Sequence, residues 1–124
     1  MGKKILMVED SAEWRQMVAE ALTEAGFEVV AVSGASEAVL QKELTDLRLI
    51  VLDLDLGGEN GLMLMKHLKR HHPLVPIIIY TGMEPDDRAV QRMREQGASV
   101  FLRKGPISLL VEKVKQTVDE AQLG

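Results

Sequence analysis

The chain has 124 residues, of which 46% are hydrophobic, and it contains no cysteine. This length and hydrophobic content predict one compact domain, and the absence of cysteine excludes a disulfide framework and thiolate zinc sites. The net charge of -4 argues against general nucleic-acid binding, which needs a surface rich in lysine and arginine. The opening residues, MGKKILMV, contain an apolar run far too short to span a bilayer. We therefore expect a cytoplasmic domain that binds neither nucleic acid nor membranes directly.

Apolar runs of strand length alternate with segments of helical periodicity. The first run, KKILMV at 3–8, is followed by apolar residues at helical spacing from Trp14 to Ala25. The other expected elements are, in chain order, strand 28–32, helix 36–44, strand 49–53, helix 62–71, strand 77–81, helix 85–96, strand 100–102 and helix 107–121. Pro85, followed by two aspartates, predicts the start of the fourth helix. The pattern predicts an α/β fold in which a single five-stranded parallel sheet is covered by helices on both faces, a doubly wound (βα)5 arrangement.

Polar side chains stand at the ends of four of the expected strands. A doubly wound sheet binds its ligands outside the carboxyl ends of its strands. Two acids follow the first strand, two more stand at the end of the third, a hydroxyl ends the fourth and an ammonium follows the fifth. These residues are Glu9, Asp10, Asp53, Asp55, Thr81 and Lys104. We expect them to meet at one edge of the sheet.

This set of groups suggests phosphoryl chemistry. Carboxylates that lie close together repel one another, and a divalent cation relieves that repulsion. Oxygen ligands without histidine or cysteine favour Mg²⁺ or Mn²⁺ over zinc. Such a metal, together with Lys104 and the Thr81 hydroxyl, would stabilise the negative oxygens of a phosphoryl group. One carboxylate is then left to act as the nucleophile, and Asp53 is the candidate because it is central on the edge.

Four motifs carry a resemblance to a known family. ILMVED, LIVLDLDLGGENG, PIIIYTG and FLRKGP occur in an order and spacing that resemble the receiver domains of two-component response regulators. The resemblance covers essentially the whole chain, 1–124, as a single receiver domain without an effector domain. It implies a sheet with the flavodoxin-like strand order 2-1-3-4-5.

The resemblance also implies a phosphorylation-dependent signalling switch. Asp53 would accept a phosphoryl group from the phosphohistidine of a sensor histidine kinase or phosphotransfer protein. Asp10 would bind Mg²⁺ directly, Glu9 would bind it through water, and Asp55 would contribute its backbone carbonyl. Such a protein is not an enzyme with a separate substrate, because it catalyses only its own phosphoryl transfer and dephosphorylation.

The same resemblance implies how the signal would leave the site. Lys104 and Thr81 would bind the phosphoryl group, and Phe101 stands at the position of the family's switch aromatic. The face made by the fourth helix, fifth strand and fifth helix would then change and contact a downstream protein or effector domain. The sequence leaves the cognate kinase, that partner and possible homodimerisation open.

The sequence departs from the family pattern at several positions. Gly105 separates Lys104 from Pro106, where a cis-proline usually follows the lysine, so the geometry of this bond and the placement of Lys104 stay open. Gly57 stands where a proline is common and should loosen its loop. The extra carboxylate of Asp55 should alter the lifetime of the phosphoryl group in a direction that the sequence does not indicate.

Simpler interpretations compete with each assignment. Asp53 and Asp55 of the second motif could merely begin a turn. The pair Glu9 and Asp10 could merely cap the first helix, and Phe101 could merely fill the core. Competing functions are a receiver-like interaction module that is never phosphorylated, a phosphatase of the haloacid-dehalogenase type, and a flavodoxin-type flavin protein. The order of the motifs disfavours the phosphatase, and acids in the first loop disfavour a flavin phosphate.

Overall fold

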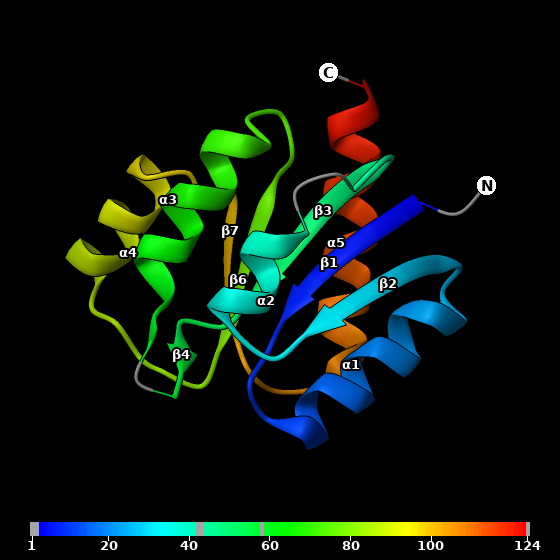
Figure 1. Ribbon diagram of the computed structural model, residues 1–124, viewed down its shortest axis with the longest axis horizontal. Coiled ribbons are helices and arrows are strands. Elements are labelled where there is room, and N and C mark those ends of the chain that lie inside the picture. Colours follow the sequence, from blue (N-terminus) through cyan, green and yellow to red (C-terminus); the bar gives the residue numbers. More distant parts are fainter. Residues whose placement is uncertain (1–2, 42–43, 58, 124) are drawn as a thin grey trace.

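The computed structural model describes residues 3–41, 44–57 and 59–123. Its main sheet has five parallel strands in the order β2-β1-β3-β6-β7. Counted along the chain within this sheet, the order is 2-1-3-4-5, so the predicted flavodoxin-like, doubly wound arrangement is confirmed (Figure 1). The strands are β1 (Lys3–Val8), β2 (Phe27–Val32), β3 (Leu47–Leu52), β6 (Ile77–Thr81) and β7 (Val100–Arg103).

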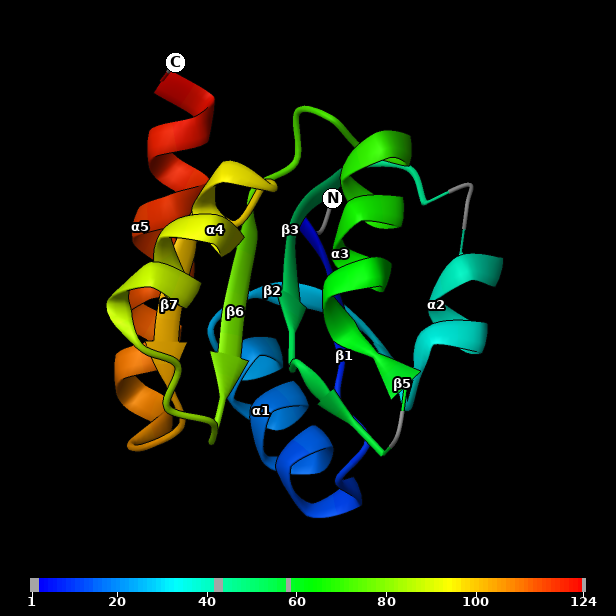
Figure 2. The ribbon, with the colours of Figure 1, turned by 90° about the vertical axis from the view of Figure 1, so that its left-hand side faces the viewer.

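Helices cover both faces of the sheet (Figures 1 and 2). Because side chains alternate along a strand, each strand contributes to two cores. Leu6 packs on the side of α2, α3 and α4, and its neighbour Ile5 packs on the side of α1 and α5. The helices are α1 (Ala12–Glu24), α2 (Ala35–Leu40), α3 (Gly61–His71), α4 (Asp87–Glu95) and α5 (Ile107–Leu123).

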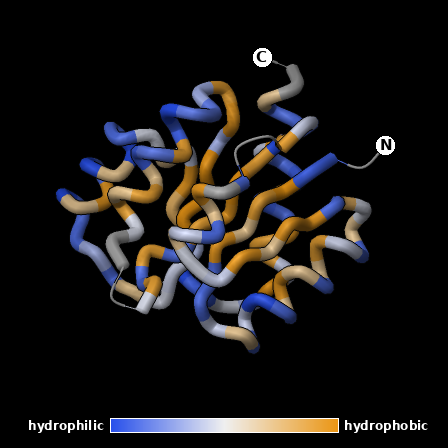
Figure 3. The backbone as a smooth tube through the Cα atoms, in the orientation of Figure 1, coloured by the Kyte–Doolittle hydropathy of each residue, from blue (hydrophilic) through white to orange (hydrophobic). Residues whose placement is uncertain are grey.

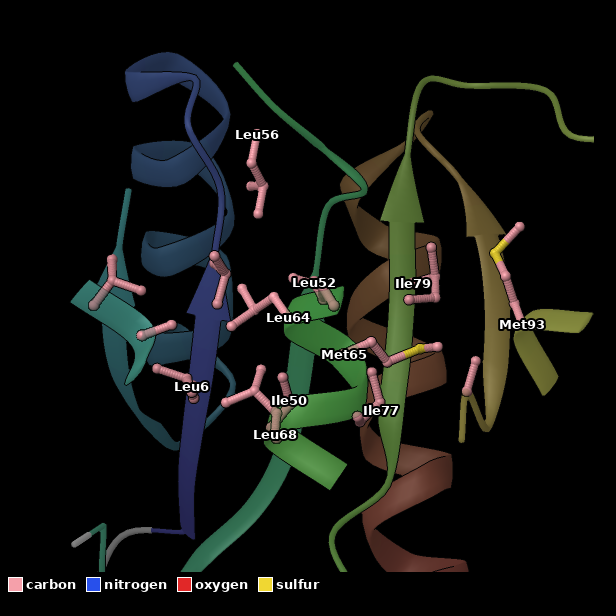
Figure 4. Close-up of a cluster of buried hydrophobic side chains, with 14 residues drawn as sticks. Leu6, Ile50, Leu52, Leu56, Leu64, Met65, Leu68, Ile77, Ile79 and Met93 are labelled. Atoms are coloured by element: carbon pink, nitrogen blue, oxygen red, sulfur yellow. The ribbon is translucent and has the colours of Figure 1, made fainter. Parts of the chain in front are cut away.

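The apolar residues concentrate in the strands and on the inner sides of the helices (Figure 3). On the α3 side, Leu64, Met65 and Leu68 lie over the strand residues Ile50 and Ile77 (Figure 4). All five are less than 5% exposed. This packing makes the sheet a rigid support for the loops at its carboxyl edge. No helix in the described part of the chain has the length and apolar character needed to cross a membrane.

The structure adds a short hairpin that the sequence did not predict. β4 (Asp55–Leu56) and β5 (Glu59–Asn60) pair in antiparallel fashion outside the main sheet. Figure 2 shows the hairpin at the end of the sheet toward which the arrowheads of β3 and β6 point. Strands of two residues are too short to show a period-two pattern, so hydrophobic periodicity cannot predict them. Gly57, with φ 64°, follows β4 in the left-handed region that glycine adopts easily.

The fourth helix begins later than predicted. The Asp86 side chain accepts a hydrogen bond from the Ala89 N–H at 2.8 Å and so caps α4, which starts at Asp87. Pro85 therefore lies before the helix, and the predicted start at residue 85 is wrong by two residues. The second helix is also shorter than predicted, because Gln41 leaves the helical region with ψ 52°. Part of its predicted end, 42–43, lies outside the described residues.

Candidate functional site

Three carboxylates meet where β1 and β3 end. Val8 and Leu52 are paired in the parallel ladder, so the residues that follow them emerge side by side. The Asp53 N–H donates to the Val8 carbonyl at 3.1 Å, which continues the ladder by one step. Glu9, Asp10 and Asp53 each place one carboxylate oxygen within 4.8 Å of the others. Glu9 and Asp53 are both 4% exposed, whereas Asp10 is exposed.

Lys104 supplies the positive charge that these acids need. Its Nζ lies 2.9 Å from Asp53 Oδ2 and 2.5 Å from Glu9 Oε1, and the side chain is 11% exposed. The Lys104 N–H donates to the Thr81 carbonyl at 2.8 Å, which holds the end of β7 beside the end of β6. The ammonium also lies 5.0 Å from the centroid of the Trp14 ring. A buried carboxylate is tolerated when it is paired and hydrogen-bonded in this way.

The pKa values of Glu9 and Lys104 reflect this crowding. Burial raises the pKa of Glu9, the Lys104 hydrogen bond works against that rise, and the charge of Asp53 adds to it. Burial by itself would lower the pKa of Lys104, but the hydrogen bonds with Glu9 and Asp53 outweigh it and the pKa is raised. Three carboxylates thus face one ammonium, and the cluster carries excess negative charge.

This donor set fits a hard divalent cation. Glu9, Asp10 and Asp53 offer carboxylate oxygens that already lie close together, with the exposed Asp10 open to solvent. Mg²⁺ prefers such oxygens and keeps several waters, which a site with one open side permits. The Asp55 side chain is exposed, and its N–H donates to Asp53 Oδ1 at 3.0 Å. The role predicted for the Asp55 backbone carbonyl as a metal ligand stays a prediction.

Thr81 and Phe101 lie on neighbouring strands beside this cluster. Thr81 ends β6, is fully buried and accepts a hydrogen bond at Oγ1 from the Met83 N–H at 3.3 Å. Phe101 on β7 is paired with Ile79 and packs, partly buried, against the core on the α2, α3 and α4 side. The predicted core packing of Phe101 is therefore present, and its role as a switch stays a prediction.

Arg15 supports the acid pair, although the sequence did not single it out. Its Nη1 donates to the Glu9 carbonyl at 2.8 Å and to the Asp10 carbonyl at 3.3 Å. Ser11 caps α1 by accepting from the Trp14 N–H, so the alternative that the acid pair is the helix cap is wrong. Arginine contacts to backbone carbonyls leave no periodic signal, and only the folded chain reveals them.

Tyr80 is a second residue whose place the sequence did not indicate. Its hydroxyl lies against the backbone of Gly105, next to Lys104. The signal that could have found it is a tyrosine in the aliphatic run PIIIYTG, because a buried tyrosine hydroxyl needs a hydrogen-bond partner. The described residues contain no cis peptide bond, so the bond between Gly105 and Pro106 is trans.

Replacing Lys104 by methionine should destabilise the protein in metal-free buffer by about 2 kcal/mol at neutral pH, because two buried carboxylates lose their cation. The hydrogen bond and charge of Lys104 lower the pKa of Glu9, so their removal raises it further. An acid with a raised pKa binds a proton on folding, and stability then falls as the pH rises from the unfolded value of 4.5 through the folded one.

The loss on replacing Lys104 should therefore be larger at about pH 7 than at about pH 5. The contribution of Lys104's own titration to stability is constant over this range. Its pKa is raised on folding, so the stability that it adds is lost only as the pH rises above the unfolded value of 10.5. Urea unfolding at both pH values measures the difference, with the exposed Lys66→Met as the control. An equal loss of stability at both pH values would contradict the effect of Lys104 on the pKa of Glu9.

Comparison with known proteins identifies similar chains along nearly the whole sequence. The family described as response regulator receiver domain matches residues 5–115. The phosphate regulon transcriptional regulatory protein PhoB of Pseudomonas aeruginosa is 37% identical over 108 residues, which cover 84% of this chain and 46% of PhoB. The chain spans less than half the length of the curated relatives it matches.

Solved structures agree with this match. A CheY-like receiver domain protein from Methanospirillum hungatei JF-1 superposes with a TM-score of 0.89 at 25% identity and covers 98% of both chains. A response regulator from Burkholderia pseudomallei, solved with a phosphorylated aspartic acid, a calcium ion and citrate, has a TM-score of 0.82 at 25% identity. It covers 98% of this chain and 71% of its own. The resemblance predicted from the four motifs is confirmed.

Proposed function

The chain belongs to the response regulator receiver domain family, and we propose that it is a phosphorylation-dependent switch whose phosphoacceptor is Asp53. The observation that carries this proposal is the environment of the Asp53 carboxylate. It is buried, held at Oδ2 by Lys104 and at Oδ1 by the Asp55 N–H, and faces the acids of the β1 end. A carboxylate oriented from both sides is prepared to act as a nucleophile.

The phosphoryl group would come from the phosphohistidine of a sensor histidine kinase or phosphotransfer protein. An Asp53 oxygen attacks phosphorus, the new O–P bond forms and the P–N bond to histidine breaks, and the bonding pair stays with the histidine nitrogen. Lys104 then follows the negative charge from the carboxylate to the phosphoryl oxygens. The Thr81 hydroxyl, now bound by the Met83 N–H, would turn to donate to one of them.

The carboxylates of Glu9, Asp10 and Asp53 would hold Mg²⁺, and Mn²⁺ suits the same oxygens. Bound there, the cation would neutralise the negative charge that develops on the phosphoryl oxygens. Residues of this chain would position the acids and the nucleophile. Arg15 holds the backbone of the acid pair, and Lys104 binds and orients the Asp53 carboxylate. The Burkholderia pseudomallei regulator, with its phosphorylated aspartate and calcium ion, supports this assignment by similarity.

We propose that the signal leaves through α4, β7 and α5. Phe101 lies on β7, and the Lys104 N–H bonds to the end of β6, so a movement at Thr81 reaches the strand that carries the aromatic ring. Phosphorylation would shift the population toward the state in which Phe101 is turned inward. The partner is a downstream protein or an effector domain. Pseudomonas aeruginosa PhoB, as a transcriptional regulatory protein, is one relative with such an output.

To test phosphorylation, the protein is incubated with acetyl phosphate and Mg²⁺, and its intact mass is measured over time. We expect one added phosphoryl group per chain, formed with Mg²⁺ or Mn²⁺ and absent with EDTA, because the excess carboxylate charge repels an anionic donor until a cation neutralises it. If no adduct forms with either metal, or from a panel of sensor kinases, the chain is a receiver-like interaction module that is not phosphorylated.

A further inference from the structure

Tyr80 holds the residue that follows Lys104. The Tyr80 hydroxyl donates to the Gly105 carbonyl at 3.1 Å, and it accepts a hydrogen bond from the Gly105 N–H at 3.3 Å. One side-chain atom thus binds both backbone groups of one glycine. We propose that Tyr80 is a positioning residue that sets the Lys104 ammonium against Asp53 by clamping Gly105. This inference rests on the proposed phosphoacceptor function.

The Tyr80 ring is itself held firmly. It is 2% exposed, it lies on the interior strand β6 opposite Leu102 of β7, and it contacts the Trp14 ring edge to face with centroids 5.9 Å apart. A side chain fixed by packing places its terminal atom within narrow limits. The Tyr80 hydroxyl therefore has a fixed position in the core, and its hydrogen bonds can hold the loop that follows β7.

Gly105, in the loop between β7 and α5, is the residue whose backbone most needs a fixed hydrogen-bond partner. Glycine has the widest range of backbone conformations, and Gly105 is exposed. On its other side, the Lys104 N–H bonds to the Thr81 carbonyl, so the lysine backbone is fixed both before and after its Cα atom. Trp14 lies next to both Tyr80 and the end of the Lys104 side chain, since its ring contacts the Tyr80 ring and its centroid lies 5.0 Å from the Lys104 Nζ.

The alternative is that the Tyr80 hydroxyl only satisfies its own need for a hydrogen bond in the core. In that case its removal would lower stability without changing what Lys104 does. Tyr80→Phe tests this, because it removes the hydroxyl and keeps the ring. Thr117→Val is the matched control, since it removes another buried hydroxyl, which binds the Lys113 carbonyl on α5 away from the site.

The first measurement is the rate of phosphorylation by acetyl phosphate. We expect Tyr80→Phe to react about three- to tenfold more slowly than the wild type, the factor set by the loss of roughly one hydrogen bond's net energy, and Thr117→Val to react at the wild-type rate. In a Lys104→Met background, Tyr80→Phe should cause no further decrease, because a residue that acts through Lys104 has nothing left to position. Equal effects in both backgrounds would overturn the proposal.

The second measurement does not depend on phosphorylation. In metal-free buffer, NMR hydrogen exchange should show a faster Gly105 amide in Tyr80→Phe and an unchanged one in Thr117→Val. If the wild type forms no adduct, the proposed function fails and this measurement alone decides whether the clamp exists. If the wild type forms an adduct and Tyr80→Phe reacts at the same rate, the positioning role of Tyr80 is overturned while the proposed function stands.

Discussion

We expect the replacement of Asp53 by asparagine to abolish the phosphoryl adduct with acetyl phosphate, whichever divalent metal is supplied. Asparagine has nearly the shape of aspartate, and its single amide oxygen can still accept from one of the two donors, Lys104 and the Asp55 N–H, that bind the two oxygens of Asp53. Its neutral amide is not a nucleophile toward phosphorus, so the rate falls below detection. Intact mass after incubation with the donor measures the effect, and circular dichroism checks that the fold is retained.

Asp55→Asn is the control for that experiment. Asp55 lies two residues further along and is exposed, and it contacts Asp53 through its backbone N–H, which the substitution keeps. We expect this variant to form the adduct, with a changed lifetime because a carboxylate close to the phosphoryl group is removed. An adduct that persists in Asp53→Asn and disappears in Asp55→Asn would move the acceptor to Asp55.

Gly61→Ala should destabilise the protein by roughly 2–4 kcal/mol, because no space exists for a methyl group at that position. A Cβ on Gly61 would lie 2.7 Å from both the Cα and the O of Leu54, and 3.0 Å from its C. All three atoms are backbone, so no side-chain rotation relieves the overlap. The connection from β3 to α3 would have to move, and Leu54 directly follows Asp53. Phosphorylation should therefore slow as well as stability fall.

Gly82→Ala is the matched control for Gly61→Ala. A Cβ at Gly82 would meet nothing within 4 Å, and the residue is exposed at the other side of the site. We expect its free energy of unfolding to stay within about 0.5 kcal/mol of the wild type. Urea unfolding of both variants gives the comparison, and a Gly61→Ala protein as stable as Gly82→Ala would show that the β3 to α3 connection adapts.

Local patterns predicted the elements but not all of their ends. Aliphatic runs such as PIIIYT predict buried strands, and the structure has β6 there. Capping decided the starts of two helices, because side chains of Ser11 and Asp86 reached N–H groups three residues on. Helices fray and are recapped locally, which is why their ends were the weakest part of the prediction.

The residue order by itself determined the family and the fold, since strand and helix periodicity and the four motifs all lie in contiguous segments. It also selected the acids, the hydroxyl and the lysine, because parallel strands bring their carboxyl ends to one edge. Only the tertiary structure decided which of these groups touch. Lys104 meets Asp53 and Glu9 across 51 and 95 positions, and Tyr80 meets Gly105 across 25. Such contacts depend on the register and packing of strands distant in sequence, which no local pattern encodes.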